Sequence, residues 1–164
     1  MLRIVAVLAR ALVWSTLFVG FVLMFLPARV LSAAGVTSPG RWGAAQLAGL
    51  VLGTAGSALA AWCILGFVVF GRGTPAPFDP PRQLVVRGPY RFVRNPMYLG
   101  AGLALAGAAL FYESGALGAY AVGFLLVMHL FVVLHEEPTL RRTFGDAYAA
   151  YCTRIHRWLP RISA

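Results

Sequence analysis

The stretch RGPYRFVRNPMYLG, residues 87–100, places three arginines directly before a long apolar run. Arg94 is the last of them and lies two residues before Pro96, a residue type that fits the first turn of a helix because its missing N–H would have no helical partner there. Arginine-rich short loops beside apolar helices stay in the cytoplasm. We therefore predict that a membrane helix begins at Pro96, on the cytoplasmic side.

The composition also indicates a membrane protein. Of 164 residues, 60% are hydrophobic, and the mean hydropathy is +0.77. The net charge of +9 comes from 14 arginines, since the chain has no lysine. The arginines cluster beside apolar segments, which favours anionic lipid headgroups and not nucleic acid as the partner. The oligomeric state stays open, because small-residue helix faces serve contacts within and between chains alike.

Four apolar segments are long enough, or nearly so, to span a bilayer. A hydrocarbon core of about 30 Å takes roughly 20 helical residues, and the segments cover residues 4–30, 42–70, 96–112 and 116–134. We expect the first to be a retained anchor. Its alternative is a cleavable signal peptide, since two arginines precede the apolar run and small residues follow it.

The arginine distribution predicts topology. The connector at 71–95 and the tail at 136–164 each hold five arginines, whereas the turn Glu113-Ser114-Gly115 holds none. Both termini should therefore be cytoplasmic. We expect one all-α integral membrane domain, residues 1–164, in a bacterial inner membrane, with two N-terminal helices in 1–70 and a helical hairpin in 96–135.

The tail after Glu137 reads as a separate amphipathic helix. Pro138 suits its first turn, and apolar residues recur at helical spacing at Leu140, Phe144, Tyr148, Tyr151 and Ile155. Such a helix is expected to lie on the cytoplasmic membrane surface or to fold back over the bundle.

Two constellations are candidates for chemistry. The first, Arg94-Asn95-Pro96 with Tyr98, lies where a helix begins, and free N–H groups there favour an anion. The second is His135-Glu136-Glu137. Two adjacent carboxylates beside apolar residues are costly unless cations or donors meet them.

Both constellations also have structural interpretations. Arginine and tyrosine at a membrane helix end are often anchors, and the acid pair is equally explained by salt bridges to Arg94, Arg141 or Arg142. The tight turn at 113–115 predicts that Asn95 and Glu136 meet at the open end of the hairpin. The resulting pocket suits a zwitterionic ligand that carries an ammonium and a carboxylate.

His129 lies seven residues before Glu136, on the same face of the expected helix. It is a candidate for the lining of the same cavity, although a hydrogen bond to a neighbouring helix explains it equally well. The histidines and carboxylates match no zinc-ligand spacing, so we expect no metal site. The chain also contains no P-loop or Rossmann motif.

Taken together, LVVRGPYRFVRNPMYLG and HEEPTLRRTFGDAYAAYCTRIHRWLP resemble the integral-membrane methyltransferases that include isoprenylcysteine carboxyl methyltransferase and phosphatidylethanolamine N-methyltransferase. The resemblance covers residues 82–160. It implies S-adenosylmethionine as the cofactor, bound at the cytoplasmic mouth. It also implies the cofactor-binding residues Gln83, Leu84, Val85, Tyr90, Arg94, Asn95, Pro96, Tyr98, Glu136 and Glu137. Asn95 stands where the family usually has histidine, and it cannot become cationic near neutral pH.

The expected function is therefore methyl transfer to a lipophilic acceptor, either a prenyl-cysteine-type carboxylate or a phospholipid amine. Arg94 would orient a carboxylate, and Glu136 or His129 would serve as the base for an amine. Two alternatives remain. One is an NADPH-dependent membrane reductase with sterol-reductase-like architecture, and the other is a membrane protein without enzymatic activity.

Overall fold

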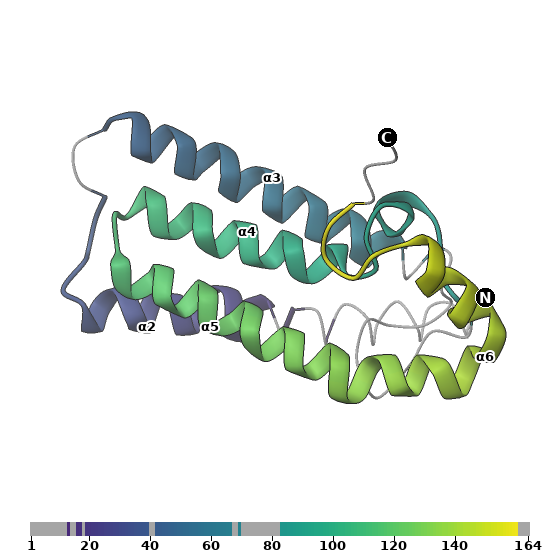
Figure 1. The fold of residues 1–164 in the computed structure, drawn as a ribbon. Coiled ribbons are helices and arrows are strands. Elements are labelled where there is room, and N and C mark those ends of the chain that lie inside the picture. The colour runs from purple at the N-terminus through teal and green to yellow at the C-terminus, as the bar shows by residue number, and fades with distance from the viewer. Residues whose placement is uncertain are drawn as a thin grey trace.

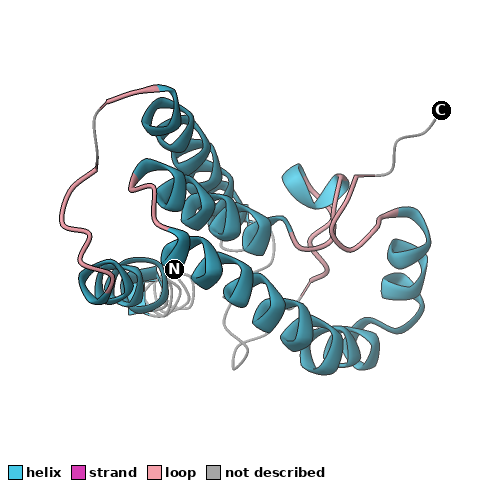
Figure 2. Ribbon diagram, turned by 60° about the vertical axis from the view of Figure 1, so that its left-hand side comes forward, coloured by secondary structure: helices cyan, strands magenta, loops and turns pink. Residues whose placement is uncertain are grey.

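The computed structural model describes residues 13, 16–17, 19–39, 42–66, 69 and 83–160. These residues form helices, turns and loops, with no strand among them (Figure 2). Residues 4–12 of the first predicted span and residues 71–82 of the connector lie outside the described residues. In chain order the helical elements are η1 (Val19–Phe25), α2 (Leu26–Ala33), α3 (Ala44–Gly66), η3 (Gly88–Arg91), α4 (Pro96–Phe111), α5 (Gly115–Phe131), η4 (Val132–Glu136) and α6 (Glu137–Arg154).

The helix boundaries agree with the sequence in two places and differ in another. Helix α4 begins at Pro96, as predicted. The tail helix α6 begins at Glu137 with Pro138 in its first turn, as predicted. The prediction that it is separate from the fourth helix is wrong, because α5 continues through the π-helical turn η4 into α6. Pro138 has no N–H to donate, and the wider turn of η4 directly before α6 accommodates that missing bond without ending the helix.

Helices α3 and α4 pack with their backbones in contact (Figure 1). A Cβ added to Gly56 would lie 2.5 Å from the Ala104 nitrogen and 2.6 Å from the Gly100 oxygen. One added to Gly49 would lie 2.5 Å from the Phe111 nitrogen. Burying an apolar side chain away from apolar lipid gains little free energy. Helices in a membrane therefore associate through close packing of this kind. Glycine at these positions is therefore a condition for the α3–α4 contact.

We expect Gly56→Leu to lower the thermal unfolding temperature of the detergent-purified protein. A side chain at this position must push the two helices apart, and overpacking of this kind costs about 1–3 kcal/mol or more. Gly123→Leu is the matched control, because no atom lies within 4 Å of a Cβ added there. Equal unfolding temperatures for the two variants would contradict the packing argument.

The remaining helices complete the bundle. Helices α4 and α5 are joined by residues 112–114 and share a core of Ala101, Leu105, Ala121 and Phe124. The segment η1–α2 packs against this core, and the Tyr120 hydroxyl donates to the Val22 carbonyl at 2.7 Å.

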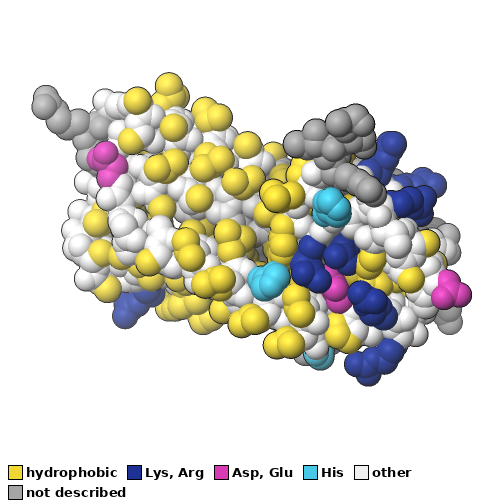
Figure 3. All heavy atoms as spheres, in the orientation of Figure 1, with side chains coloured by type: hydrophobic (Ala, Val, Ile, Leu, Met, Phe, Trp, Pro, Cys, Tyr) yellow, Lys and Arg dark blue, Asp and Glu magenta, His cyan; other side chains and the backbone are white. Residues whose placement is uncertain are grey.

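Two helices are long and apolar enough to cross a membrane: α3, and the helical stretch Gly115–Arg154, which is kinked at Gly145 in its α6 part. The helices Gly20–Ala33 and Pro96–Phe111 are apolar but shorter. Hydrophobic side chains cover much of the face over α3, α4 and α5, whereas the arginines gather mainly at the end formed by α6 and the C-terminal residues (Figure 3). Four spans and a transmembrane hairpin stay predictions.

Candidate functional site

The residues after α6 turn back over the start of α4. We call residues 155–160 the C-terminal segment. Its His156 carbonyl accepts from the Arg94 backbone N–H at 2.9 Å, and its Arg157 carbonyl accepts from Asn95 Nδ2 at 3.2 Å. Figure 2 shows this segment beside the loop that leads into α4. The C-terminal segment is therefore part of the same structure as the predicted site.

Glu137 is held by two arginines. Arg157 donates from Nε to Oε1 at 2.6 Å and from Nη2 to Oε2 at 3.1 Å, and Arg94 Nη1 lies 3.2 Å from Oε1. The Glu137 side chain is only 8% exposed. Burial by itself raises its pKa, but the Arg157 hydrogen bonds and the charges of Arg94, Arg157 and Arg141 together hold the pKa below its usual value. Glu137 is therefore a paired, ionised carboxylate.

Glu136 has different surroundings. A bilayer span of about 20 residues that starts at Gly115 ends near Leu134, so this carboxyl lies just beyond it. The Tyr98 hydroxyl donates to its Oε2 at 3.1 Å, and Oε1 accepts no hydrogen bond from the described residues. Burial raises the pKa of Glu136, the Tyr98 hydrogen bond partly opposes the rise, and the charge of Glu137 adds to it. One carboxylate oxygen is thus left for a further cation.

The start of α4 has no side-chain cap. Asn95 occupies the N-cap position but makes no capping hydrogen bond, because its amide donates to the C-terminal segment instead. The N–H groups of a helix's first turn have no partner within the helix and attract negative charge. Arg94 lies beside them. Its Nη1 also donates to Cys152 Sγ at 2.7 Å, whereas its buried Nε has no partner in the described part of the chain.

His129 contacts the C-terminal segment. Its Nδ1 accepts from the Trp158 indole N–H at 3.0 Å, and the two rings lie 5.9 Å apart. The expectation that His129 and Glu136 share a helical face assumed regular α-helical spacing. The π-helical turn η4 lies between them and changes that spacing.

The predicted residues of the connector lie in two settings. Gln83 is exposed and Leu84 is half-buried, while Val85 packs with Tyr90 and Cys63 in a buried apolar cluster. The Tyr90 carbonyl accepts from the Tyr151 hydroxyl at 2.7 Å. Burial raises the pKa of Tyr90, and its neighbours Cys63, Glu136 and Tyr98 raise it further.

The structure therefore gathers most of the predicted residues at one end of the bundle. Tyr98 meets Glu136, and Arg94 meets Glu137. Asn95 donates to the C-terminal segment directly before the buried Pro96, where α4 begins. Sequence reasoning missed Arg157 and Trp158. The only signal was their position in the HRWLP run after the helix. Arg157 was interpreted as a topology determinant, and the salt-bridge partners considered for the acid pair were Arg94, Arg141 and Arg142.

Comparison with protein families gives one match, Phospholipid methyltransferase, over residues 44–147. Comparisons with curated proteins and with solved structures gave no match. The matched region covers well over half of the chain and includes both constellations, and it ends before the C-terminal segment. The family implies a methyltransferase, and together with two helices that can cross a bilayer it indicates a membrane protein. The chain belongs to the phospholipid methyltransferase family, as the resemblance in its sequence predicted.

Proposed function

We propose that the protein transfers a methyl group from S-adenosylmethionine to the amine of a phospholipid at the cytoplasmic membrane face. The observation that carries the proposal is Glu136, a half-buried carboxylate that accepts from the Tyr98 hydroxyl at 3.1 Å, while its other oxygen accepts no hydrogen bond from the described residues. It lies at the end of the bundle where α4 starts without a side-chain cap. The arginine-rich connector and tail support the cytoplasmic side.

The residues at this end of the bundle fit the cofactor's amino-acid part. Its ammonium needs a carboxylate, and Glu136 offers the free oxygen. Its carboxylate needs donors, which Arg94 Nε and the first-turn amides of α4 supply. When bound, the cofactor supplies an electrophilic methyl group, whose bond to sulfur breaks as the acceptor nitrogen forms its own bond to carbon.

Glu137 has a different role in this proposal. A carboxylate accepts about four hydrogen bonds, and three donors from Arg157 and Arg94 already meet Glu137. It therefore positions Arg94 and the C-terminal segment and does not bind the cofactor ammonium. For the rest of the cofactor, Gln83, Leu84 and Tyr90 offer a wall on the connector side.

The acceptor chemistry determines whether a base is needed. A lipid amine must lose a proton before it attacks, and a carboxylate does not. The family description favours a phospholipid over a prenyl-cysteine carboxylate. Glu136 is a poor base while it holds an ammonium. His129 accepts the Trp158 indole N–H through Nδ1, so its neutral ring carries a proton on Nε2 and its lone pair is already engaged. We propose that His129 takes the proton of the amine at Nδ1 once Trp158 releases that nitrogen.

The test combines binding and turnover. Calorimetric titration of the detergent-purified protein with S-adenosylhomocysteine should give saturable binding, and NADPH, as the control ligand, should give none. S-adenosylmethionine with a labelled methyl group should then label phosphatidylethanolamine in mixed micelles.

Each of the other possible results would support a different function. NADPH binding without S-adenosylhomocysteine binding would replace the proposal with a reductase. If neither ligand binds, the membrane protein without enzymatic activity is the remaining alternative. Cofactor binding with label in a prenyl-cysteine analogue, but not in phosphatidylethanolamine, would overturn the acceptor alone.

A further inference from the structure

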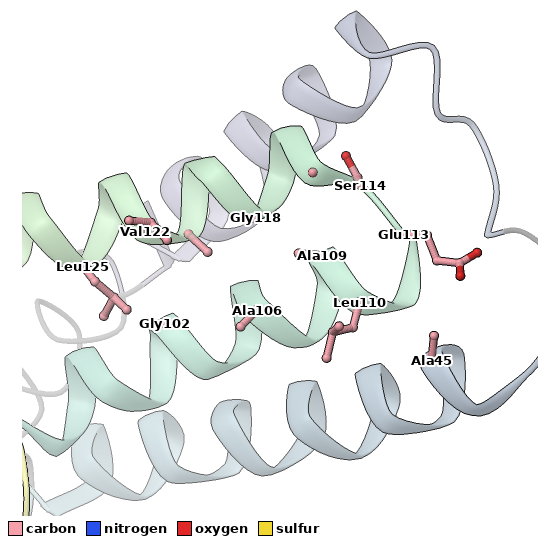
Figure 4. Close-up of a pocket in the computed structure, with 12 residues that line it drawn as sticks. Ala45, Gly102, Ala106, Ala109, Leu110, Glu113, Ser114, Gly118, Val122 and Leu125 are labelled. Atoms are coloured by element: carbon pink, nitrogen blue, oxygen red, sulfur yellow. The ribbon is translucent and has the colours of Figure 1, made fainter.

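An apolar cavity lies between α4 and α5, at the end of the bundle opposite the acid pair. It has a volume of about 600 Å³, within the range of about 300–1,000 Å³ found for small-molecule sites. Figure 4 shows its walls, which are mostly alanine, glycine and aliphatic side chains, among them Gly102, Ala106, Ala109, Gly118, Val122 and Leu125. We call it the α4–α5 groove.

The length and depth of the α4–α5 groove match one leaflet of a bilayer. Its lining on α4 runs from Gly102 to Leu110, and eight residues at 1.5 Å each extend about 12 Å, to which the turn with Glu113 and Ser114 adds the outer end. Half of a hydrocarbon core is about 15 Å. The groove begins seven residues after Asn95, about 10 Å along the helix. It therefore occupies the half of the bilayer that is farther from the candidate active site.

The outer end of the groove is polar. Glu113 and Ser114 lie there, and the Ser114 hydroxyl already accepts from the Leu117 N–H at 3.3 Å. Glu113 is exposed, and its carboxylate points away from the helices (Figure 4). At this depth a carboxylate meets the headgroups of the leaflet opposite the active site. Helix α2, which carries the exposed Arg29, lies at the same end of the bundle (Figure 1).

We propose that the α4–α5 groove binds one acyl chain of a phospholipid from that opposite leaflet, with the amine of its headgroup against Glu113. Such a headgroup complements the carboxylate of Glu113 with its amine, at the polar outer end of the groove. The site is separate from the methyl acceptor's site, and the inference requires only that α4 and α5 cross the bilayer.

Packing, and not transfer out of water, determines the preference for this occupant. An acyl chain in the bilayer is already in apolar surroundings, so the groove gains dispersion contacts along its walls and one ion pair at its end. Small side chains make the walls of the groove, and a chain that fills it restores contacts that these walls otherwise lack. Selectivity for the headgroup then comes from Glu113.

The test uses two leucine substitutions in the same helix. Gly118 lines the groove and Gly123 does not, and a Cβ at either position meets no atom within 4 Å. Leucine also favours a helix more than glycine does, so neither change should hinder folding. The protein and its variants are incubated with phosphatidylethanolamine or phosphatidylglycerol that carry identical acyl chains, and retained lipid is counted by native mass spectrometry.

We expect the wild-type protein and Gly123→Leu to retain phosphatidylethanolamine in preference to phosphatidylglycerol, and Gly118→Leu to retain at least tenfold less of it. Glu113→Gln should keep a bound lipid but lose the preference. Any lipid bound at the active site is retained by both leucine variants. The difference in retained lipid between the two variants therefore measures binding to the α4–α5 groove alone, whether or not methyl transfer occurs. Equal retention by Gly118→Leu and Gly123→Leu would overturn the proposal, as would a wild-type protein that retains both lipids equally.

Discussion

Glu137→Ala is expected to destabilise the protein by about 3 kcal/mol and to abolish binding of S-adenosylhomocysteine. The change removes the carboxylate that joins Arg94 to Arg157 and leaves the buried Arg94 guanidinium without its counter-charge. Breaking one partner of a buried pair costs about 3–5 kcal/mol. We expect the lower value because the Arg157 side chain is 31% exposed, so water screens the charge interaction between Arg157 and Glu137.

Thermal unfolding in detergent measures this effect, and a loss of about 3 kcal/mol corresponds to a drop of roughly 6–12 °C. Asp146→Ala is the matched control, since Asp146 is an exposed acid of the same helix α6. It should change neither the unfolding temperature nor the binding. If Glu137→Ala and Asp146→Ala unfold at the same temperature, the two-arginine pairing does not stabilise the fold.

Glu136→Gln is expected to weaken S-adenosylhomocysteine binding by at least about 30-fold without lowering the unfolding temperature. Removing one partner of a buried charge pair costs about 2–5 kcal/mol of binding, and 1.4 kcal/mol is a factor of ten. The amide keeps the shape of the side chain and an oxygen for the Tyr98 hydroxyl. It lacks the charge that we propose holds the cofactor ammonium.

The direction of the expected change in stability follows from the pKa of Glu136. Burial raises the pKa of Glu136 above its unfolded value, so its ionised form costs stability at pH values above that unfolded pKa. Neutral glutamine removes that cost, and the unfolding temperature should stay equal or rise. Titration calorimetry and thermal unfolding of the same sample test both halves. Unchanged binding would refute the assignment of Glu136 to the cofactor, and joint loss of binding and stability would make it structural.

Much of the fold could be predicted because its signals are local. The apolar run after Pro96 and the proline itself predict the start of α4. The end of the fourth helix could not be predicted in this way. Pro138 normally marks a helix start, and only the neighbouring π-helical turn lets α5 continue past it.

The candidate site, too, could be predicted from the sequence only in part. Sequence predicted that the start of α4 and the acid pair would meet, because a tight turn between two helices brings their other ends together, and the contact between Tyr98 and Glu136 agrees. It could not distinguish the two acids, which are adjacent and chemically alike. Arg157 distinguishes them, and it lies 20 residues after Glu137.

The sequence by itself thus determined the membrane class, the family, the start of α4 and the residues that gather there, because hydrophobicity, proline and short turns act over a few residues. Only the tertiary structure decided which carboxylate is paired and which has an oxygen to spare. That depends on where the C-terminal segment folds, and the Arg157 and His156 contacts that place it join residues far apart in the chain.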